Sequence, residues 1–183
     1  MKFLFLEELK QFRLTSVMKI LSIIFLRLIK NITHRQMKFR ILKLSEKNIS
    51  KQQINTFVDT LDVYINQTIL TKLQDVSTRT LLATAAPLLY AQAIKEKYHF
   101  NDVIATEYTH VDKWTENIKE EKKKSYLKLL HDKAIDPKKV ILYSDHHDDL
   151  PLMKITDFTY LVQPSETTKN AVRDAHIPFE IIE

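Results

Sequence analysis

Glycine is completely absent from this chain of 183 residues, whereas average usage of about 7% would supply about a dozen. Phosphate-binding P-loops and the Rossmann dinucleotide fingerprint both depend on glycines at fixed positions, so the sequence excludes both. Backbone positions with positive φ must be filled by other residues, and we expect Asn, Asp, His or Lys there, at some cost in stability.

Cysteine is absent as well, which excludes disulfides and thiolate metal sites. No secretory signal with a small-residue cleavage site is evident, and the sequence therefore predicts a cytoplasmic protein. A composition of 44% hydrophobic and 28% charged residues indicates a folded domain, alone or with a small insert. The net charge of +5 is spread over many lysines without interleaved aromatic residues, so we expect no nucleic-acid binding.

The chain also lacks an apolar run long enough to span a bilayer. The best candidate, residues 14–29, contains Lys19 and Arg27 and is shorter than the roughly 20 apolar residues required. Its apolar residues recur at helical spacing, which predicts an amphipathic helix. They are Val17, Ile20, Leu21, Ile24, Phe25 and Leu28. Contact of residues 14–30 with a membrane surface remains an alternative role for this helix.

The first half of the chain has mainly helical patterns. Residues 1–12 favour a helix, with a short strand as the alternative, and residues 34–70 are helical with Ser50 as an N-cap.

Helical and strand patterns alternate over the second half of the chain. Alternating strands and helices are typical of a parallel sheet, so the sequence predicts an α/β fold. Strands are expected at 79–87, 102–106, 140–143, 158–162 and 179–182, helices at 88–98, about 116–133 and from 166, and a hairpin or flap at 109–116.

The most informative stretch is V-I-L-Y-S-D-H-H-D-D-L-P-L-M at residues 140–153. It predicts a buried strand that ends at Ser144 and delivers acidic groups to the edge of a sheet, where α/β proteins place their ligands. Asp145 and Asp149 converge if the chain turns into a helix there, and two oxygen ligands suit Mg²⁺ better than Zn²⁺. The alternative is a helix N-terminus at which Asp serves only as a cap.

The segment Y-S-D-H-H-D-D-L-P-L-M resembles the fourth motif of the haloacid dehalogenase superfamily, in the branch similar to phosphoserine phosphatases. The resemblance implies a Rossmann-like parallel sheet with helices on both faces and a helical cap, with residues 1–75 as the cap region and 76–183 as the core. It further implies that Asp145 and Asp149 hold Mg²⁺. The family reaction is hydrolysis of a phosphomonoester through a phosphoaspartate, and the implied partner is a small phosphorylated metabolite.

Two further motifs of that family have counterparts here. R-T-L-L-A-T-A-A-P at residues 79–87 is similar to the second motif, which implies that the hydroxyl of Thr84 contacts a phosphoryl oxygen. The third motif, N-C-x-G-x-x-K-x-x-x-L, is similar to the sequence from Asn117 to Leu127 and implies substrate contacts from Asn117 and Lys123. Glu120 replaces the usual glycine, so Lys122 remains an alternative to the preferred Lys123.

The first motif of the family, F-D-x-D-G-T, has no counterpart, because no D-x-D occurs before residue 60. Alignment of residues 3–10 with it places Leu6 at the nucleophile and Glu8 at the acid. Hydrolysis through a phosphoaspartate requires that nucleophile, so we expect a truncated or inactive form. The alternatives are a non-catalytic module that binds phosphate or a phosphoprotein, and an interaction protein that uses its N-terminal helix.

The missing motif is also the central strand of the resembled sheet. We therefore expect either that residues 2–6 take that position or that the sheet keeps an apolar slot. The sequence does not fix the oligomeric state.

Overall fold

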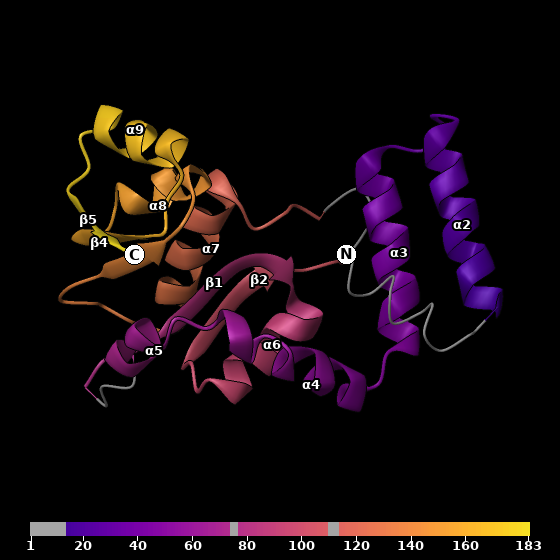
Figure 1. Cartoon of the computed structure of the whole chain (residues 1–183), viewed down its shortest axis with the longest axis horizontal. Helices are drawn as coiled ribbons and strands as arrows, with labels where there is room; N and C mark the ends of the chain where they lie inside the picture. Colours follow the sequence, from indigo (N-terminus) through magenta and orange to yellow (C-terminus); the bar gives the residue numbers. More distant parts are fainter. Residues whose placement is uncertain (1–13, 74–76, 110–113) are drawn as a thin grey trace. The chain divides into compact units, whose positions relative to one another are not determined.

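The protein is described here by a computed structural model, in which residues 14–73, 77–109 and 114–183 are described. The chain divides into two compact units (Figure 1), and each is described by itself. The first unit comprises Met1–Leu82 and Ala86–Thr115, and the second comprises Ala83–Ala85 and Glu116–Glu183. The expected division into a cap at 1–75 and a core at 76–183 remains a prediction.

The first unit begins with helices, as the sequence predicts. They are α2 (Leu14–Leu28), α3 (His34–Asn48), α4 (Lys51–Asp59), the 3₁₀ helix η1 (Asp62–Tyr64) and α5 (Gln67–Leu73). Capping boxes start two of them: the side chains of Thr33 and Ser50 accept from the backbone N–H of Gln36 and Gln53, whose side chains accept in return. The predicted N-cap at Ser50 is confirmed. The expectation for residues 1–12 lies outside the described residues.

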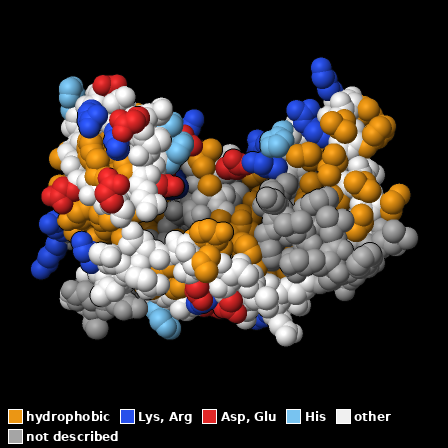
Figure 2. All heavy atoms as spheres, viewed as in Figure 1, with side chains coloured by type: hydrophobic (Ala, Val, Ile, Leu, Met, Phe, Trp, Pro, Cys, Tyr) orange, Lys and Arg blue, Asp and Glu red, His pale blue; other side chains and the backbone are white. Residues whose placement is uncertain are grey.

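Helix α2 carries apolar side chains on two faces. Ile20 is fully buried, and α2 packs on α3. Four further apolar side chains are exposed, and hydrophobic side chains are visible on the surface of this helix (Figure 2). They are Met18, Leu21, Phe25 and Leu28, with exposed fractions of 59%, 49%, 59% and 73%. The predicted apolar stripe is therefore divided between the helix pair and the surface. Among the described residues, no helix is long and apolar enough to cross a membrane.

The strand β1 (Leu81–Pro87), the helix α6 (Leu88–Lys97) and the strand β2 (Asp102–Thr106) follow. β1 and β2 form a two-stranded sheet, and α6 packs against both β2 and α4. The predicted flap at 109–116 lies partly outside the described residues. Within it, Trp114 is buried, and its carbonyl oxygen accepts a hydrogen bond from Arg35 of α3.

The second unit is a small parallel sheet with helices. Its strands β3 (Ile141–Ser144), β4 (Phe158–Val162) and β5 (Phe179–Ile182) run in that order, and its helices are α7 (Lys119–Asp132), η2 (His147–Asp149), α8 (Leu150–Met153) and α9 (Glu166–Asp174). Both strand pairs are parallel, with Tyr143 opposite Tyr160 and Leu161 opposite Ile181. Met153, Leu161 and Val172 form its buried core. The predicted α/β class is confirmed.

The sheet differs from the expectation in one respect. The strands of the described residues form two separate sheets, β1-β2 and β3-β4-β5, rather than one. β3 pairs only with β4 and lies at the edge of its sheet in the part of the chain that the structure describes. No strand that would join the two sheets occurs in this part of the chain. The segment 2–6, expected as one candidate for that position, lies outside the described residues.

Left-handed backbone conformations occur without glycine. Among the described residues, six have positive φ, between 44° and 59°: Lys30, His99, Lys119, Ala134, Gln163 and His176. The expected use of Lys and His is confirmed, whereas the expected Asn and Asp do not occur at these positions and Ala and Gln do. Four of the six directly follow the C-caps of α2, α6, α7 and α9, where glycine is the usual residue.

Candidate functional site

The site is built around the end of strand β3. Ser144, the last residue of β3, is buried, and the chain turns directly into η2 and α8. Pro151 lies in the first turn of α8, where a missing N–H costs nothing. This turn brings Asp149 back to the strand end, where its Oδ2 accepts a hydrogen bond of 2.8 Å from the hydroxyl of Ser144.

Lys122 of α7 forms an ion pair with Asp149. Its Nζ donates to Oδ1 of Asp149, and the two side chains are only 9% and 12% exposed. Lys123, which the sequence favoured for this role, is half-buried and forms no hydrogen bond or ion pair with the described residues. The structure thus pairs Lys122, the alternative lysine, with Asp149, and the assignment of the lysine of the third motif stays a prediction.

The backbone of α7 bears on the register of the third motif. Lys119, its first residue, has φ of 52°, a conformation that favours glycine. In the third motif the glycine precedes the lysine by three residues, and Lys119 precedes Lys122 by three. The register through Lys122 would place Lys119 at the glycine and Glu116 at the asparagine of the motif, whereas the register through Lys123 keeps Asn117 at the asparagine. The sequence left both registers open, because neither Lys119 nor Glu120 is a glycine.

Thr84 and Asn117 are brought together in the same unit. Nδ2 of Asn117 donates to the backbone carbonyl of Thr84 over 3.0 Å, and Asn117 is 3% exposed. This bond attaches the loop before α7 to the middle of β1. The contact uses the backbone of Thr84, and the predicted role of its hydroxyl stays a prediction.

Asp145 and Asp149 have different environments. Asp145 is exposed and forms no hydrogen bond or ion pair with the described residues, so its carboxylate is available. Both carboxylate oxygens of Asp149 already accept from Lys122 and Ser144. The shared binding of Mg²⁺ by Asp145 and Asp149 stays a prediction. A hard cation such as Mg²⁺ fits the oxygens of Asp145, whereas Asp149 as placed here orients Lys122.

Two tyrosines on elements of the site are held in their neutral form. Burial is the main cause of the raised pKa of Tyr126 on α7, with a smaller contribution from the charge of Asp157. Burial likewise raises the pKa of Tyr143 on β3, whose ring stacks on Tyr160 at 5.0 Å. Both phenols therefore contribute packing rather than charge.

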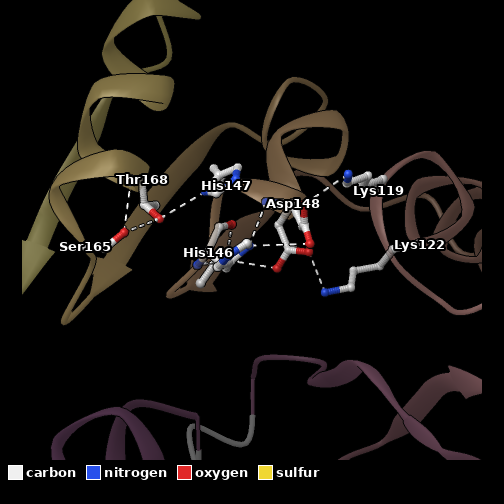
Figure 3. A network of polar contacts seen from close by, with 9 residues as sticks. Lys119, Lys122, His146, His147, Asp148, Ser165 and Thr168 are labelled. Carbon is white, nitrogen blue, oxygen red and sulfur yellow. Dashed lines mark hydrogen bonds and ion pairs between the residues drawn. The ribbon is translucent and has the colours of Figure 1, made fainter. Parts of the chain in front are cut away.

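A cluster of His146, His147 and Asp148 was missed by the sequence reasoning. One potential metal-ligating atom from each residue lies within 4.8 Å of the others. Figure 3 shows the two histidines between Thr168 on one side and Asp148 with Lys119 and Lys122 on the other. The sequence signal was present, since two adjacent histidines lie between aspartates, but the prediction assigned metal binding only to Asp145 and Asp149.

A hollow in the first unit does not involve these residues. It is lined by residues of α3, α6 and the segment after β2, among them Leu42, Leu88 and Tyr108. None of the predicted site residues lines it.

The sequence matches the family described as haloacid dehalogenase-like hydrolase over residues 2–154. No curated protein matches the chain. A protein of unknown function from Bordetella pertussis Tohama I is similar in structure, with a TM-score of 0.64 and 15% identity over 88% of this chain and 79% of that chain.

Two further solved structures are similar to this chain. One is a HAD family hydrolase from Salmonella enterica serovar Typhi, with a TM-score of 0.55 and 16% identity over 91% of this chain and 58% of that chain. The other is a phosphoserine phosphohydrolase-like protein from Francisella tularensis SCHU S4, with a TM-score of 0.50 and 13% identity over 97% of this chain and 87% of that chain. At these identities the likeness establishes the fold alone.

Proposed function

The chain belongs to the haloacid dehalogenase-like hydrolases, and we propose that its second unit binds the phosphoryl group of a small phosphorylated molecule together with Mg²⁺. We further propose that the chain does not hydrolyse that group through a phosphoaspartate. Binding and turnover are argued separately, because they rest on different residues.

The observation that carries the binding proposal is the buried pair of Lys122 and Asp149, together with the exposed Asp145 four residues before Asp149 in the sequence. An ammonium group has three donors, and the bond to Asp149 uses one of them. The remaining donors suit a phosphoryl oxygen, and the carboxylate of Asp145 suits a divalent cation. Asp145 directly follows the end of the parallel strand β3, a common position for ligands in α/β sheets, and Lys122 of α7 pairs with Asp149 four residues later.

Each residue then has a distinct role in the proposal. Lys122 and the hydroxyl of Thr84 bind phosphoryl oxygens, and Asp145 holds the cation. Asp149 and Asn117 are positioning residues, since the first orients Lys122 and the second ties the loop before α7 to Thr84. A bound Mg²⁺ would supply charge stabilisation to the phosphoryl group.

Turnover is a different matter, because the covalent route requires a carboxylate in line with phosphorus. In the proposed alignment of residues 3–10 with the first motif, Leu6 stands at the nucleophile and Glu8 at the acid, and the family match covers this segment. Direct attack by water forfeits the proximity of an enzyme-borne nucleophile, an effect that reaches several powers of ten in rate.

A p-nitrophenyl phosphate assay with Mg²⁺ tests the turnover proposal. We expect no metal-dependent hydrolysis by the unaltered chain. Four substitutions, Leu6→Asp, Glu8→Asp, Leu9→Gly and Lys10→Thr, convert F-L-E-E-L-K at residues 5–10 into F-D-E-D-G-T, and we expect this variant to gain activity that Asp145→Asn removes. Hydrolysis by the unaltered chain that depends on Asp145 would show that another nucleophile is present.

Titration calorimetry with Mg²⁺ and then with inorganic phosphate tests the binding proposal. Asp145→Asn is expected to abolish the Mg²⁺ signal, and Asp136→Asn, an exposed acid outside the site, serves as its control. Equal isotherms for the two variants contradict the assignment of Asp145.

A second candidate function is contact with an anionic membrane surface through α2. The exposed Met18, Leu21, Phe25 and Leu28 follow one another at helical spacing, and the helix contains Lys19 and Arg27 but no acidic residue. Sedimentation with phosphatidylglycerol vesicles tests this role. Phe25→Asp should abolish binding, whereas Val63→Asp, at an equally apolar position that is 81% exposed, should not. If Phe25→Asp still binds the vesicles, this face of α2 is not the membrane contact.

A further inference from the structure

We infer that His146, His147 and Asp148 form a binding site for a transition-metal ion, Zn²⁺ in the first instance, separate from the cation position at Asp145. Their ligand atoms lie within 4.8 Å of one another. Two imidazoles and one carboxylate are the donor set of many zinc sites that keep a fourth position for water. Imidazole ligands favour Zn²⁺, Ni²⁺ and Cu²⁺ over Mg²⁺, so this site and Asp145 select different ions.

The spacing of His146 and Asp148 already suits such an ion. Nδ1 of His146 and Oδ2 of Asp148 are 3.5 Å apart. In a tetrahedral site with bonds of about 2.0–2.1 Å, two ligand atoms are about 3.3–3.4 Å apart. Nδ1 of His146 currently accepts from the backbone N–H of Asp148 over 3.1 Å, and the ion takes the place of that hydrogen bond. The His146 side chain is 52% exposed, which leaves its ring free to adjust.

His147 is held in an orientation that metal-binding histidines commonly have. Its Nδ1 lies 3.4 Å from the hydroxyl of Thr168, which leaves Nε2 as the free ligand atom when Nδ1 carries the proton. Thr168 is fully buried, and its own hydroxyl accepts from Ser165, the N-cap of α9. Residues on α9 therefore fix the imidazole of His147, whose ring stacks on that of His146 with centroids 4.2 Å apart.

Asp148 has a similar outer partner. Nζ of Lys119 lies 3.6 Å from its Oδ1, while the neighbouring Oδ2 faces His146. One carboxylate oxygen is thus balanced by an ammonium group and the other is directed toward the histidines, an arrangement that suits a single metal–oxygen bond.

Titration calorimetry of the whole chain with Zn²⁺, after removal of metals by a chelator, tests the site, with Co²⁺ absorption as a spectroscopic readout. We expect one Zn²⁺ per chain. His147→Ala and Asp148→Asn should each weaken binding more than tenfold, and Thr168→Val should weaken it about tenfold through the orientation of His147.

Two controls separate this site from others. His131→Ala removes an exposed histidine that lies 3.3 Å from Asp132 without a second histidine, and it should leave Zn²⁺ binding unchanged. Asp145→Asn should also leave it unchanged. Binding that survives His147→Ala, or that Asp145→Asn removes to the same extent, overturns the proposal.

The unsubstituted chain provides an independent test that does not depend on the folding of variants. Of the seven histidines, only the ring nitrogens of His146 and His147 should shift in nitrogen NMR spectra during the Zn²⁺ titration. Shifts confined to other histidines, or no shifts at all, overturn the assignment.

Discussion

At the scale of single residues, the geometry of the site depends on which of two adjacent lysines pairs with Asp149. Lys122 and Lys123 are chemically identical, and only the rotation of α7 places one of them at Asp149. The structure buries Lys122 with Tyr126 one turn later, whereas Leu127, which the motif pairs with Lys123, is 46% exposed. A run of lysines contains no hydrophobic signal that fixes this rotation, so the sequence alone left both registers open.

The buried pair leads to a prediction about stability. Lys122→Met leaves the carboxylate of Asp149 buried without its cation, and removal of one partner from a buried pair typically costs about 3–5 kcal/mol. We expect urea unfolding to show a loss of that order. Lys123→Met, the matched control, should change the free energy of unfolding by about 0.5 kcal/mol or less.

The double variant Lys122→Met with Asp149→Leu extends this test. Replacement of a buried pair by apolar residues is often neutral, so we expect it to recover much of the stability that Lys122→Met loses. Equal losses for Lys122→Met and Lys123→Met would argue against the register seen in the structure.

At the scale of elements, the absence of glycine affects the helix ends. After α7, the N–H of Ala134 donates to the carbonyl of His131 and that of Ile135 donates to Leu130, the two bonds of a Schellman motif. α2, α6 and α9 end with the same pair of bonds. The helices keep the usual termination geometry although a residue with a β-carbon occupies the left-handed position.

Ala134→Gly should therefore stabilise the protein. The left-handed conformation costs a residue with a β-carbon about 1–2 kcal/mol, and glycine avoids that cost. Part of the gain is offset by the greater freedom of glycine in the unfolded chain, so we expect a net increase of about 1 kcal/mol in urea unfolding. Lys128→Gly, at an exposed interior position of α7, is the control and should cost about 1 kcal/mol. A loss of stability in Ala134→Gly would contradict this interpretation.

The contact between η1 and α6 predicts a dependence on pH. Hydrogen bonds from Tyr98 and then Lys97 lower the pKa of Asp62 below its ordinary value of 3.8. Because the pKa is lower in the folded state, the stabilisation is present above about pH 3.8 and is lost as the pH falls through the lower folded-state pKa.

The free energies of unfolding of the wild type and of Asp62→Asn, measured from pH 6 to pH 2, check this prediction. The wild type should be the more stable at pH 6, and the difference should shrink toward zero at the acid end. Asp132→Asn provides a control for the loss of one exposed carboxylate. A difference that stays constant with pH would mean that the charge of Asp62 does not contribute.

At the scale of the whole molecule, the sequence predicted the order of elements well and the assembly of the sheet less well. The strands at 102–106, 158–162 and 179–182 were predicted to the residue, because short β-branched and aromatic runs lie between clear helix and turn signals. The family motifs pointed to Thr84, Asn117 and Asp145 as site residues, and these assignments stay predictions. The sequence could not predict which side chains pair, since the ion pair between Lys122 and Asp149 depends on the rotation of α7 and on the turn after β3.

The edge of β3 gives the last prediction. In the part of the chain that the structure describes, β3 pairs on one side only, and Ile141 is 44% exposed. Parallel sheets are normally covered, and an open apolar edge promotes association with other chains. Our prediction is that residues 2–6, which lie outside the described residues, cover this edge.

Phe3→Asp with Phe5→Asp should disrupt such a strand and expose the edge. We expect increased binding of a hydrophobic dye and oligomers in analytical ultracentrifugation, because apolar surface becomes accessible. Val63→Asp, which introduces a charge at an exposed position of η1, is the control and should remain like the wild type. If the Phe3 and Phe5 variant matches the wild type in both measurements, residues 2–6 do not cover β3. A wild type that already binds dye and self-associates would instead show that the edge is open in the native chain.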